Sequence, residues 1–455
     1  MAMGRLFGTN GVRGIANKEL TTELVIRLAA SCGHILGKDI ALGRDGRVTS
    51  PLFRDAAASG LLSIGCNVHD LGILPTPALQ YAVKNLGLDG GLMITASHNP
   101  PEFNGVKVMA ADGVEIPRHV ENDIEGVYFA GGPKAAEWDC VGEVMNREVL
   151  SLYIDAVVSK VDASLIRFRK FKVAIDPGNG VGTLVAPTVA QRLGCNVYTI
   201  NAELDGRFPG RQSEPRPDNL GDLRELVKAT GADIGVAFDG DADRSIFLNE
   251  RGEVLWGDRS FALVANYYMR KHPGARVATA VSSSNAIVEV VEAAGGSIHW
   301  TRVGSVDVSR AMVENGIDFG GEENGGVMYG PHHPVRDGSM TMALILNIMA
   351  EGDKPLSKLV AELPTYAQAK DKVACPNELK KGVLEALRTK VAAPRVDTMD
   401  GLKLVFADSS WILVRPSGTE SIFRLYAEAD TQPKVEKLVS ENKRLIEETV
   451  KALSA

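Results

Sequence analysis

The sequence Gly65-Cys66-Asn67-Val68 recurs as Gly194-Cys195-Asn196-Val197, and each copy follows a segment with the apolar spacing of an amphipathic helix. A short β-rich run comes before each helix segment, at residues 40–43 and 172–175. Each stretch therefore predicts a β-α-β unit. The two expected helices cover residues 52–64 and 184–193.

A third, more diverged copy predicts another unit, with a strand from residue 276, a helix over 286–294 and a strand from 297. Another apolar strand follows each unit and ends in a polar loop. In open α/β sheets, sites form beyond the carboxyl ends of strands, so these three loops are expected to meet in one cleft between domains. The three strands are expected at residues 91–95, 234–238 and 317–319.

The pattern changes near residue 367. Strand-like segments at residues 410–414 and 422–427 flank a Pro-Ser-Gly turn, and a charged helix begins near Gln432. This predicts a smaller C-terminal α+β domain behind three α/β domains. The expected domains are residues 1–150, 151–255, 256–366 and 367–455.

Composition excludes several classes of protein. With 455 residues, 45% of them hydrophobic, the chain can fill several cores and is not expected to be disordered. The net charge is −7 and no basic run occurs, so neither nucleic acid nor an anionic membrane is an expected partner. Five scattered cysteines, no apolar signal core and no span-length apolar stretch indicate a cytoplasmic protein, and homo-oligomerisation stays open.

Asp239-Gly240-Asp241-Ala242-Asp243-Arg244 follows one of the buried strands and places three carboxylates at alternating positions. Such oxygen ligands favour Mg²⁺ over zinc, and without a cation three close carboxylates would repel one another. The alternative is an acidic surface turn, which the buried strand before it disfavours. The loop also lacks the glycine and distal glutamate positions of an EF-hand.

Thr95-Ala96-Ser97-His98-Asn99-Pro100 follows another of the strands and places a hydroxyl beside an imidazole. A serine hydrolase is disfavoured, because no glycines flank Ser97 as a nucleophile elbow requires, and an adjacent histidine generally points away from the serine. From this segment alone, Ser97 as the cap of a turn is a reasonable alternative.

Two further loops carry polar groups suited to a sugar phosphate. Arg415-Pro416-Ser417-Gly418-Thr419 offers a guanidinium, hydroxyls and backbone N–H groups for an anion, although a plain hairpin turn is the alternative. The segment 320–326 contains Glu322 and Asn324, which suit sugar hydroxyls, or it is a flexible acidic loop. No Walker motif is present, which excludes a P-loop NTPase.

Together with Phe7-Gly8-Thr9-Asn10-Gly11-Val12-Arg13-Gly14, these motifs resemble the α-D-phosphohexomutase superfamily over the whole chain. The resemblance implies a heart-shaped molecule of four domains, with three similar α/β domains that contain mixed sheets and a C-terminal α+β (TBP-like) domain. It implies an intramolecular phosphotransferase of the isomerase class. Hexose 1,6-bisphosphate would be its intermediate and activator.

The resemblance also implies roles for residues of this chain. Ser97 would be a phosphoserine that donates its phosphoryl group to a sugar monophosphate, and its phosphate would join Asp239, Asp241 and Asp243 around Mg²⁺. The remaining expected catalytic residues are Arg13, His98, Lys107 and Arg244, with Lys107 helping to shuttle a proton. The expected substrate-binding residues are Gly304, Glu322 and Asn324 for the sugar, and Arg415, Ser417, Gly418 and Thr419 for the phosphate that does not react.

Two positions depart from the family's pattern. Several members have a histidine, a proposed acid or base, where this chain has Gly326, and His332 and His333 are the candidate replacements. Ser305 stands where many relatives carry an acidic residue or a histidine.

The expected reaction interconverts glucosamine 6-phosphate and glucosamine 1-phosphate, on the way to UDP-N-acetylglucosamine. Mannose or glucose phosphates are the first alternative, because the Glu-Glu-Asn-Gly-Gly loop differs from the usual bacterial glucosamine version. A Mg²⁺-dependent sugar phosphatase with Asp239 as nucleophile is a second alternative. A protein that only binds sugar phosphates is a third.

Overall fold

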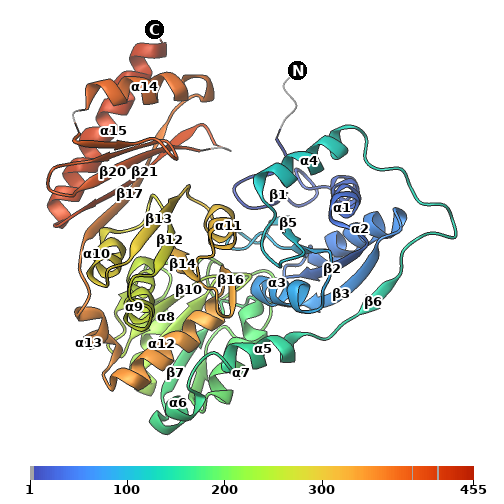
Figure 1. Ribbon diagram of the computed structural model, residues 1–455, viewed down its shortest axis with the longest axis horizontal. Coiled ribbons are helices and arrows are strands. Elements are labelled where there is room, and N and C mark those ends of the chain that lie inside the picture. The colour runs from blue at the N-terminus through green and yellow to red at the C-terminus, as the bar shows by residue number, and fades with distance from the viewer. Residues whose placement is uncertain (1–4, 392, 418–419, 455) are drawn as a thin grey trace.

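The computed structural model describes residues 5–391, 393–417 and 420–454, which form four β-sheets with helices packed on them (Figure 1). Three of the sheets share one strand order. In each, a central strand has a parallel neighbour on both sides, and the next strand beyond one of them is antiparallel. The fold is therefore the expected one, with three α/β domains that contain mixed sheets.

The first sheet runs β1 (Val12–Ile15), β5 (Phe103–Ala110), β4 (Gly90–Ile94), β2 (Asp39–Arg44), β3 (Asn67–Ile73), β6 (Val144–Asn146). The second runs β11 (Val254–Leu255), β10 (Ser245–Asn249), β9 (Ile234–Phe238), β7 (Lys172–Asp176), β8 (Asn196–Thr199). The third runs β13 (Ser297–Thr301), β12 (Arg276–Ala280), β14 (Phe319–Glu322), β15 (Gly326–Tyr329), β16 (His333–Arg336).

The three predicted crossover helices are present as α2 (Ser50–Ser63), α7 (Ala186–Arg192) and α10 (Asn285–Ala293), with a short 3-10 turn, η1 (Val181–Leu184), before α7. Each joins two parallel strands, which confirms the β-α-β units. The other helices of these domains are α1 (Thr22–Leu36), α3 (Thr76–Asn85), α4 (Arg118–Phe129), α5 (Leu150–Val158), α6 (Ala163–Arg169), α8 (Gly221–Thr230), α9 (Gly257–Lys271), α11 (Ser305–Asn315), α12 (Gly338–Gly352) and α13 (Leu356–Ala361).

One expected strand is misplaced. Residues 317–319 were expected to form a strand that ends before Gly320, whereas β14 begins at Phe319 and continues through Gly320 and Gly321. Ile317 instead belongs to the end of α11, where Gly316 adopts a left-handed conformation and the Ile317 N–H donates to the Met312 carbonyl.

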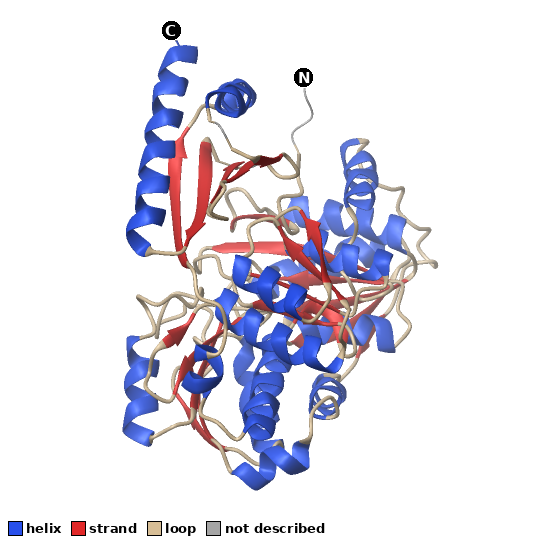
Figure 2. Ribbon diagram, turned by 60° about the vertical axis from the view of Figure 1, so that its left-hand side comes forward, coloured by secondary structure: helices blue, strands red, loops and turns tan. Residues whose placement is uncertain are grey.

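The C-terminal sheet is wholly antiparallel, in the order β17 (Ala367–Ala374), β21 (Ile422–Ala429), β20 (Trp411–Pro416), β19 (Leu402–Val405), β18 (Arg395–Asp397). Helix α15 (Gln432–Ser454) packs on this sheet and against α14 (Lys380–Lys390), which follows the short 3-10 turn η2 (Asn377–Leu379) (Figure 2). The predicted α+β domain is therefore confirmed.

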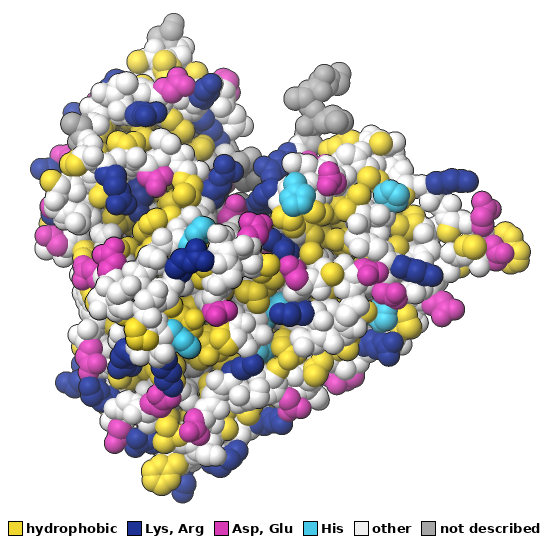
Figure 3. Space-filling view, in the orientation of Figure 1, with side chains coloured by type: hydrophobic (Ala, Val, Ile, Leu, Met, Phe, Trp, Pro, Cys, Tyr) yellow, Lys and Arg dark blue, Asp and Glu magenta, His cyan; other side chains and the backbone are white. Residues whose placement is uncertain are grey.

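Helix α12 connects the α/β domains through one core. Its residues Gly338–Ala350 are all buried, and the apolar ones among them belong to a cluster that also includes residues of α3, α7 and α9. The first and the C-terminal domains flank a notch in the heart-shaped outline, with Lys and Arg side chains on both sides of it (Figure 3). Within the described residues, no helix has the length and apolarity needed to cross a membrane.

Candidate active site

Ser97 lies in the loop after β4, and its side chain is buried. Its backbone is in the left-handed region, with φ of 51°, which is uncommon for a residue other than glycine. The Ser97 N–H donates to Thr95 Oγ1 at 2.9 Å, and Ser97 Oγ donates to Asp239 Oδ2 at 2.9 Å. The hydroxyl of the first domain is therefore joined directly to the acidic loop of the second.

Arg47, in the connection from β2 to α2, holds this loop in place. Its fully buried guanidinium pairs with Asp45 at 3.0 Å and donates to the carbonyls of Ser97 at 2.8 Å, Asn99 at 2.7 Å and Pro100 at 2.6 Å. Sequence reasoning missed this residue. In the sequence, Arg47 is marked only as a charged residue in the turn after an apolar strand.

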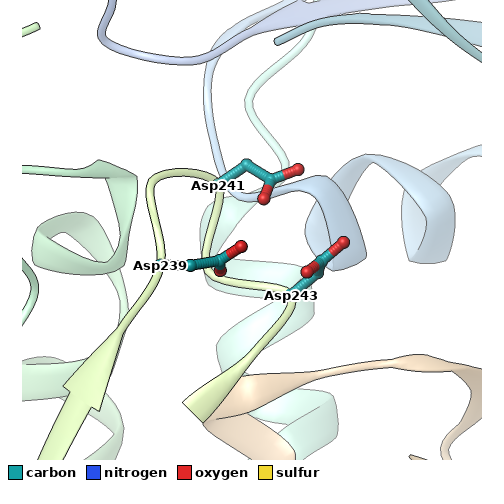
Figure 4. A group of neighbouring side chains, drawn as sticks. All are labelled: Asp239, Asp241 and Asp243. Atoms are coloured by element: carbon teal, nitrogen blue, oxygen red, sulfur yellow. The ribbon is translucent and has the colours of Figure 1, made fainter. Parts of the chain in front are cut away.

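The three aspartates after β9 form a buried cluster (Figure 4). One carboxylate oxygen from each of Asp239, Asp241 and Asp243 lies within 4.8 Å of the others, and the carboxylates surround a common space. Asp241 Oδ1 and Asp243 Oδ1 are buried without a hydrogen-bond partner in the described residues. Unpartnered buried carboxylate oxygens at this spacing fit a hard divalent cation such as Mg²⁺.

The first domain binds oxygens of two of these aspartates, Asp241 and Asp243. Asp241 Oδ2 accepts from Lys107 Nζ at 2.6 Å and from Thr76 Oγ1, at the start of α3, at 2.5 Å. Lys107 Nζ, from β5, also donates to Asp243 Oδ2 at 2.9 Å. Thr76 was not anticipated, because nothing in its local sequence distinguishes it from an ordinary residue of a helix start.

Burial, mutual repulsion and nearby cations give the three aspartates different pKa values. Burial first, and then the charges of Asp243 and Asp241, raise the pKa of Asp239 well above its ordinary value. Burial also acts to raise the pKa values of Asp241 and Asp243, but the cations beside them, Lys107 for both and Arg336 for Asp243, hold these pKa values below the ordinary range. Of the three aspartates, Asp239 is therefore the one whose charged form the cations of the chain stabilise least.

Two arginines predicted for the site flank the Ser97 loop. Arg13, from β1, donates to Asn99 Oδ1 at 2.8 Å and to the Ala96 carbonyl at 3.2 Å. Burial lowers the pKa of Arg13 to about 10, so it stays charged near neutral pH. The Arg244 N–H donates to Asp239 Oδ1 at 3.1 Å, and its guanidinium lies 3.6 Å from Glu214 Oε1.

His98 is also part of this cluster. Its Nδ1 lies 3.4 Å from Ser97 Oγ, and burial, with the charges of Arg244 and Arg13, lowers its pKa well below the ordinary value. Its backbone is fixed too, because the His98 carbonyl accepts from Ser213 Oγ at 2.7 Å. The imidazole is therefore neutral near pH 7.

The predicted sugar loop lies between β14 and β15. Glu322 is buried, and its Oε2 accepts from Arg336 Nη1 at 3.1 Å, while Arg336 Nη2 donates to Asp243 Oδ2 at 2.5 Å. Asn324 Oδ1 accepts from the Gly326 N–H at 3.2 Å. Arg336 thus connects the sugar loop to the aspartates, and sequence reasoning did not identify it.

Gly304 lies before α11, where the third domain meets the N-terminal loop. Its φ is 144°, and a Cβ there would lie 3.2 Å from Thr9 Cγ2. Ser305, one of the two departures from the family's pattern, accepts at Oγ from Asn10 Nδ2 at 2.9 Å. This serine therefore joins the loop to the Gly8–Gly14 motif.

The predicted phosphate clamp lies on the C-terminal domain, outside the cluster around Ser97. Arg415 Nε donates to Asp400 Oδ2 at 2.6 Å, and Arg415 Nη2 donates to the Val303 carbonyl at 3.3 Å. Ser417 Oγ accepts from the Glu420 N–H at 3.1 Å, and Lys380 donates to the Ser417 carbonyl at 2.6 Å. Gly418 and Thr419 lie outside the described residues.

The two histidines considered as replacements for the family's histidine lie elsewhere. His332 stacks on Tyr81, with its Nε2 3.4 Å from Asp337 Oδ2, and His333 Nε2 lies 3.2 Å from the Gly113 carbonyl. Within the described part of the chain, no hydrogen bond or ion pair joins either imidazole to Ser97, the aspartates or the sugar loop.

Comparisons with known proteins agree with this geometry. Models of the phosphoglucomutase/phosphomannomutase family match in order: alpha/beta/alpha domain I over residues 4–134, domain II over 151–252, domain III over 256–366, and the C-terminal domain over 349–445. A phosphoglucosamine/phosphogalactosamine mutase of Sulfurisphaera tokodaii is 45% identical over 98% of this chain and 100% of that protein.

Two further relatives extend the comparison. A phosphoglucomutase/phosphomannomutase of Thermococcus kodakarensis is 41% identical over 99% of this chain and all of that protein. The crystal structure of a phosphoglucomutase/phosphomannomutase family protein from Burkholderia thailandensis superposes with a TM-score of 0.88, at 27% identity, over 99% of this chain and 98% of that one.

The matched fold and family models define the class: the chain is a phosphotransferase that moves a phosphoryl group within a sugar phosphate. It belongs to the α-D-phosphohexomutase superfamily, whose models cover all four of its domains. It is therefore a phosphohexomutase, an enzyme of the isomerase class.

Proposed function

We propose that this phosphohexomutase interconverts glucosamine 6-phosphate and glucosamine 1-phosphate through a phosphoserine at Ser97. The observation that carries the mechanism is the 2.9 Å hydrogen bond from Ser97 Oγ to the buried triad of Asp239, Asp241 and Asp243. A hydroxyl beside such a cluster suits phosphoryl transfer, in which alignment and charge neutralisation supply most of the catalysis.

The reaction has two half-steps at one serine. In the first, the phosphoryl group passes from Ser97 Oγ to the free hydroxyl of the sugar phosphate, which leaves Ser97 as a hydroxyl and yields a bound hexose 1,6-bisphosphate. The intermediate then turns, and its other phosphate returns to Ser97. We assign to Lys107 the shuttling of the proton exchanged between the sugar hydroxyl and Ser97 Oγ.

Mg²⁺, held by Asp239, Asp241 and Asp243 together with the Ser97 phosphate, would supply electrostatic stabilisation of the transferring group. The residues of the chain provide the rest. Arg13 and Arg244 place positive charge close enough to the Ser97 loop to act on His98, and the neutral imidazole of His98 lies next to Ser97 Oγ.

At the other end of the substrate, the clamp would bind the phosphate that is not reacting. Arg415, with Ser417, Gly418 and Thr419, is proposed for this role, while Glu322, Asn324 and the Gly304 loop would bind the sugar ring. Because both orientations of the bisphosphate place a phosphate at the same span from Ser97, one clamp serves both half-steps.

Glucosamine is favoured as the substrate by charge and by the relatives. Its ammonium group suits the buried carboxylate of Glu322, which Arg336 binds through Oε2, whereas Glu323 is already paired with Lys370. The Sulfurisphaera tokodaii relative is named a phosphoglucosamine/phosphogalactosamine mutase. The Thermococcus kodakarensis relative is named a phosphoglucomutase/phosphomannomutase, so glucose and mannose phosphates are the second candidates.

The Ser97→Ala variant tests the mechanism. We expect it to lose mutase activity and to incorporate no labelled phosphate from hexose 1,6-bisphosphate, because the acceptor oxygen is gone. Ser59→Ala, an exposed helix serine, is the matched control and should keep full activity. Undiminished turnover by Ser97→Ala would refute a phosphoserine at this position.

A competition assay tests the substrate. Glucosamine, mannose and glucose 6-phosphates are mixed, and the relative kcat/KM of each is read from the products. We expect glucosamine 6-phosphate to be preferred. A preference for glucose or mannose phosphate would transfer the assignment to the second candidates and leave the mechanism at Ser97 unaffected.

A further inference from the structure

Gly326, at the start of β15, and Arg336, at the end of β16, compete for one space. A Cβ at position 326 would lie 2.3 Å from Cδ and 2.8 Å from Cγ of Arg336. Both distances are too short for carbon atoms that are not bonded, so a side chain at 326 and this placement of Arg336 exclude one another. The glycine at the position where the family resemblance leads one to expect a histidine therefore makes room for the arginine.

Arg336 uses that space to join two loops from different domains. Its Nη2 donates to Asp243 Oδ2 at 2.5 Å, and its Nη1 donates to Glu322 Oε2 at 3.1 Å. The side chain is only 5% exposed, so water screens these pairs little. The planar guanidinium fixes both carboxylates in direction as well as in distance.

Arg336 leaves one oxygen of Asp243 for a cation and one of its own N–H groups for a ligand. It occupies Oδ2 of Asp243, whereas Oδ1 of that carboxylate is buried without a hydrogen-bond partner in the described residues and lies 3.9 Å from Arg244 Nε. The Arg336 Nε–H is likewise buried and unpartnered within the described ranges, so one more donor is left for a ligand.

Rigid structure holds Arg336 itself. Strand β16 pairs with β15, where Met328 lies opposite Arg336. The next residue, Asp337, accepts at Oδ1 from the Tyr153 hydroxyl at 2.7 Å and from the Met340 N–H at 2.9 Å, and it caps α12. The guanidinium is therefore mounted on the buried centre of the molecule rather than on a free loop.

We propose that Arg336 is a positioning residue of the mutase reaction, which sets the sugar loop against the aspartate loop from the space that Gly326 leaves. The inference rests on the roles proposed above for Asp243 and Glu322. It assigns no proton transfer to Arg336, since a guanidinium stays charged. In this chain, Gly326 stands where several family members have a histidine. The space beside it holds the guanidinium of Arg336, which orients the carboxylates of Asp243 and Glu322.

Replacing the arginine tests this proposal. Arg336→Ala should lower kcat/KM by about 10- to 100-fold and raise the Mg²⁺ concentration for half-maximal activity by about 10-fold, as for residues that orient metal ligands. Guanidinium ion at millimolar concentration should restore part of the kcat of Arg336→Ala, whereas the same concentration of sodium chloride should not. Arg259→Ala, which removes an arginine bonded to the carbonyls of Pro364 and Val360, is the control.

A double-mutant cycle tests the shared space. Gly326→Ala alone should displace Arg336 and lower kcat/KM by about 10-fold or more. In the Arg336→Ala background, the same change should cost less than about twofold, because nothing is left to displace. Additive losses, or full activity in Gly326→Ala, would overturn the proposal. Should Arg336→Ala not fold, the activity of Gly326→Ala alone tests the proposal: a loss of about 10-fold or more supports it, and full activity overturns it.

Glu322→Gln and Asp243→Asn separate this inference from the function on which it rests. If both variants are inactive while Arg336→Ala keeps its kcat/KM and its Mg²⁺ dependence, the positioning role is wrong and the proposed function stands. If Asp243→Asn and Glu322→Gln are fully active, the proposed site itself fails, whatever Arg336→Ala shows.

Discussion

At the scale of single residues, the Ser97 loop shows how an uncommon backbone conformation is maintained. Left-handed φ in a residue other than glycine costs about 1 kcal/mol or more and persists only where the surroundings determine it. Here Arg47 binds the carbonyls on both sides of the turn, and Thr95 binds the Ser97 N–H. The position of the Ser97 hydroxyl is therefore set by a buried cation more than by its own turn sequence.

Arg47→Met tests this role. Removal of one partner of a buried ion pair leaves Asp45 uncompensated, and we expect a loss of about 3–5 kcal/mol in the free energy of unfolding, with a large fall in kcat. Calorimetry and single-turnover phosphoryl transfer measure the two effects. Arg44→Met, which removes a half-buried neighbour with one long hydrogen bond, should change both little. Equal effects of the two substitutions would contradict the prediction.

Sequence reasoning found the residues whose chemistry is visible in one short segment. Ser97 and the aspartates lie in compact polar loops after apolar strands, so their motif and their place at the sheet edge could be recognised together. Arg47, Thr76 and Arg336 were missed because each acts on a loop at least 50 residues away. Only the folded chain shows such pairs.

At the scale of elements, the repeated β-α-β units were predictable because a hydrophobic period and a glycine turn mark them locally. Strand β14 was displaced by two residues because its glycines gave no apolar signal. Those glycines fit their neighbours closely, since a Cβ on Gly321 would lie 2.9 Å from the Phe261 ring. Pairing with the neighbouring strands β12 and β15, rather than composition, decides such a strand.

The turn between β18 and β19 carries an element-scale prediction. Asp400 Oδ2 accepts from Arg415 Nε at 2.6 Å and from the Val303 N–H at 3.0 Å, so it joins the proposed phosphate clamp to the third domain. Asp400→Asn removes the charge that orients Arg415, and we expect KM for the sugar phosphate to rise about 10-fold with a smaller change in kcat.

Steady-state kinetics measures this split between KM and kcat. Asp397→Asn is the control, because its carboxylate accepts only from the nearby Met399 N–H and faces no arginine of the clamp in the described residues. An unchanged KM in Asp400→Asn, or the same rise in Asp397→Asn, would show that Asp400 does not orient the clamp.

At the scale of the whole molecule, the first and third domains meet along a seam of polar contacts. Arg310, on α11, pairs with Asp112 at 2.7 Å and donates to the Val114 carbonyl at 2.8 Å. His333 reaches the Gly113 carbonyl from β16, beside Tyr81. Because both contacts cross between domains that carry parts of the site, the seam fixes the sugar loop relative to the Ser97 loop.

This seam predicts a specific loss of stability in acid. Burial, with the charges of Lys84 and His332, lowers the pKa of His333 from 6.5 to about 4, so the folded protein holds the imidazole neutral. The unfolded chain binds a proton near pH 6.5, so stability falls as pH drops through 6.5 toward 4, by about 2–3 kcal/mol at pH 4.5 relative to pH 7.

Urea unfolding of His333→Gln at both pH values should lack this share of the pH dependence, since glutamine does not titrate but can still donate to the Gly113 carbonyl. His34→Gln, at an exposed site, should keep the full dependence of the natural chain. Identical pH profiles for His333→Gln and the natural chain would show that the imidazole is not held neutral at the seam.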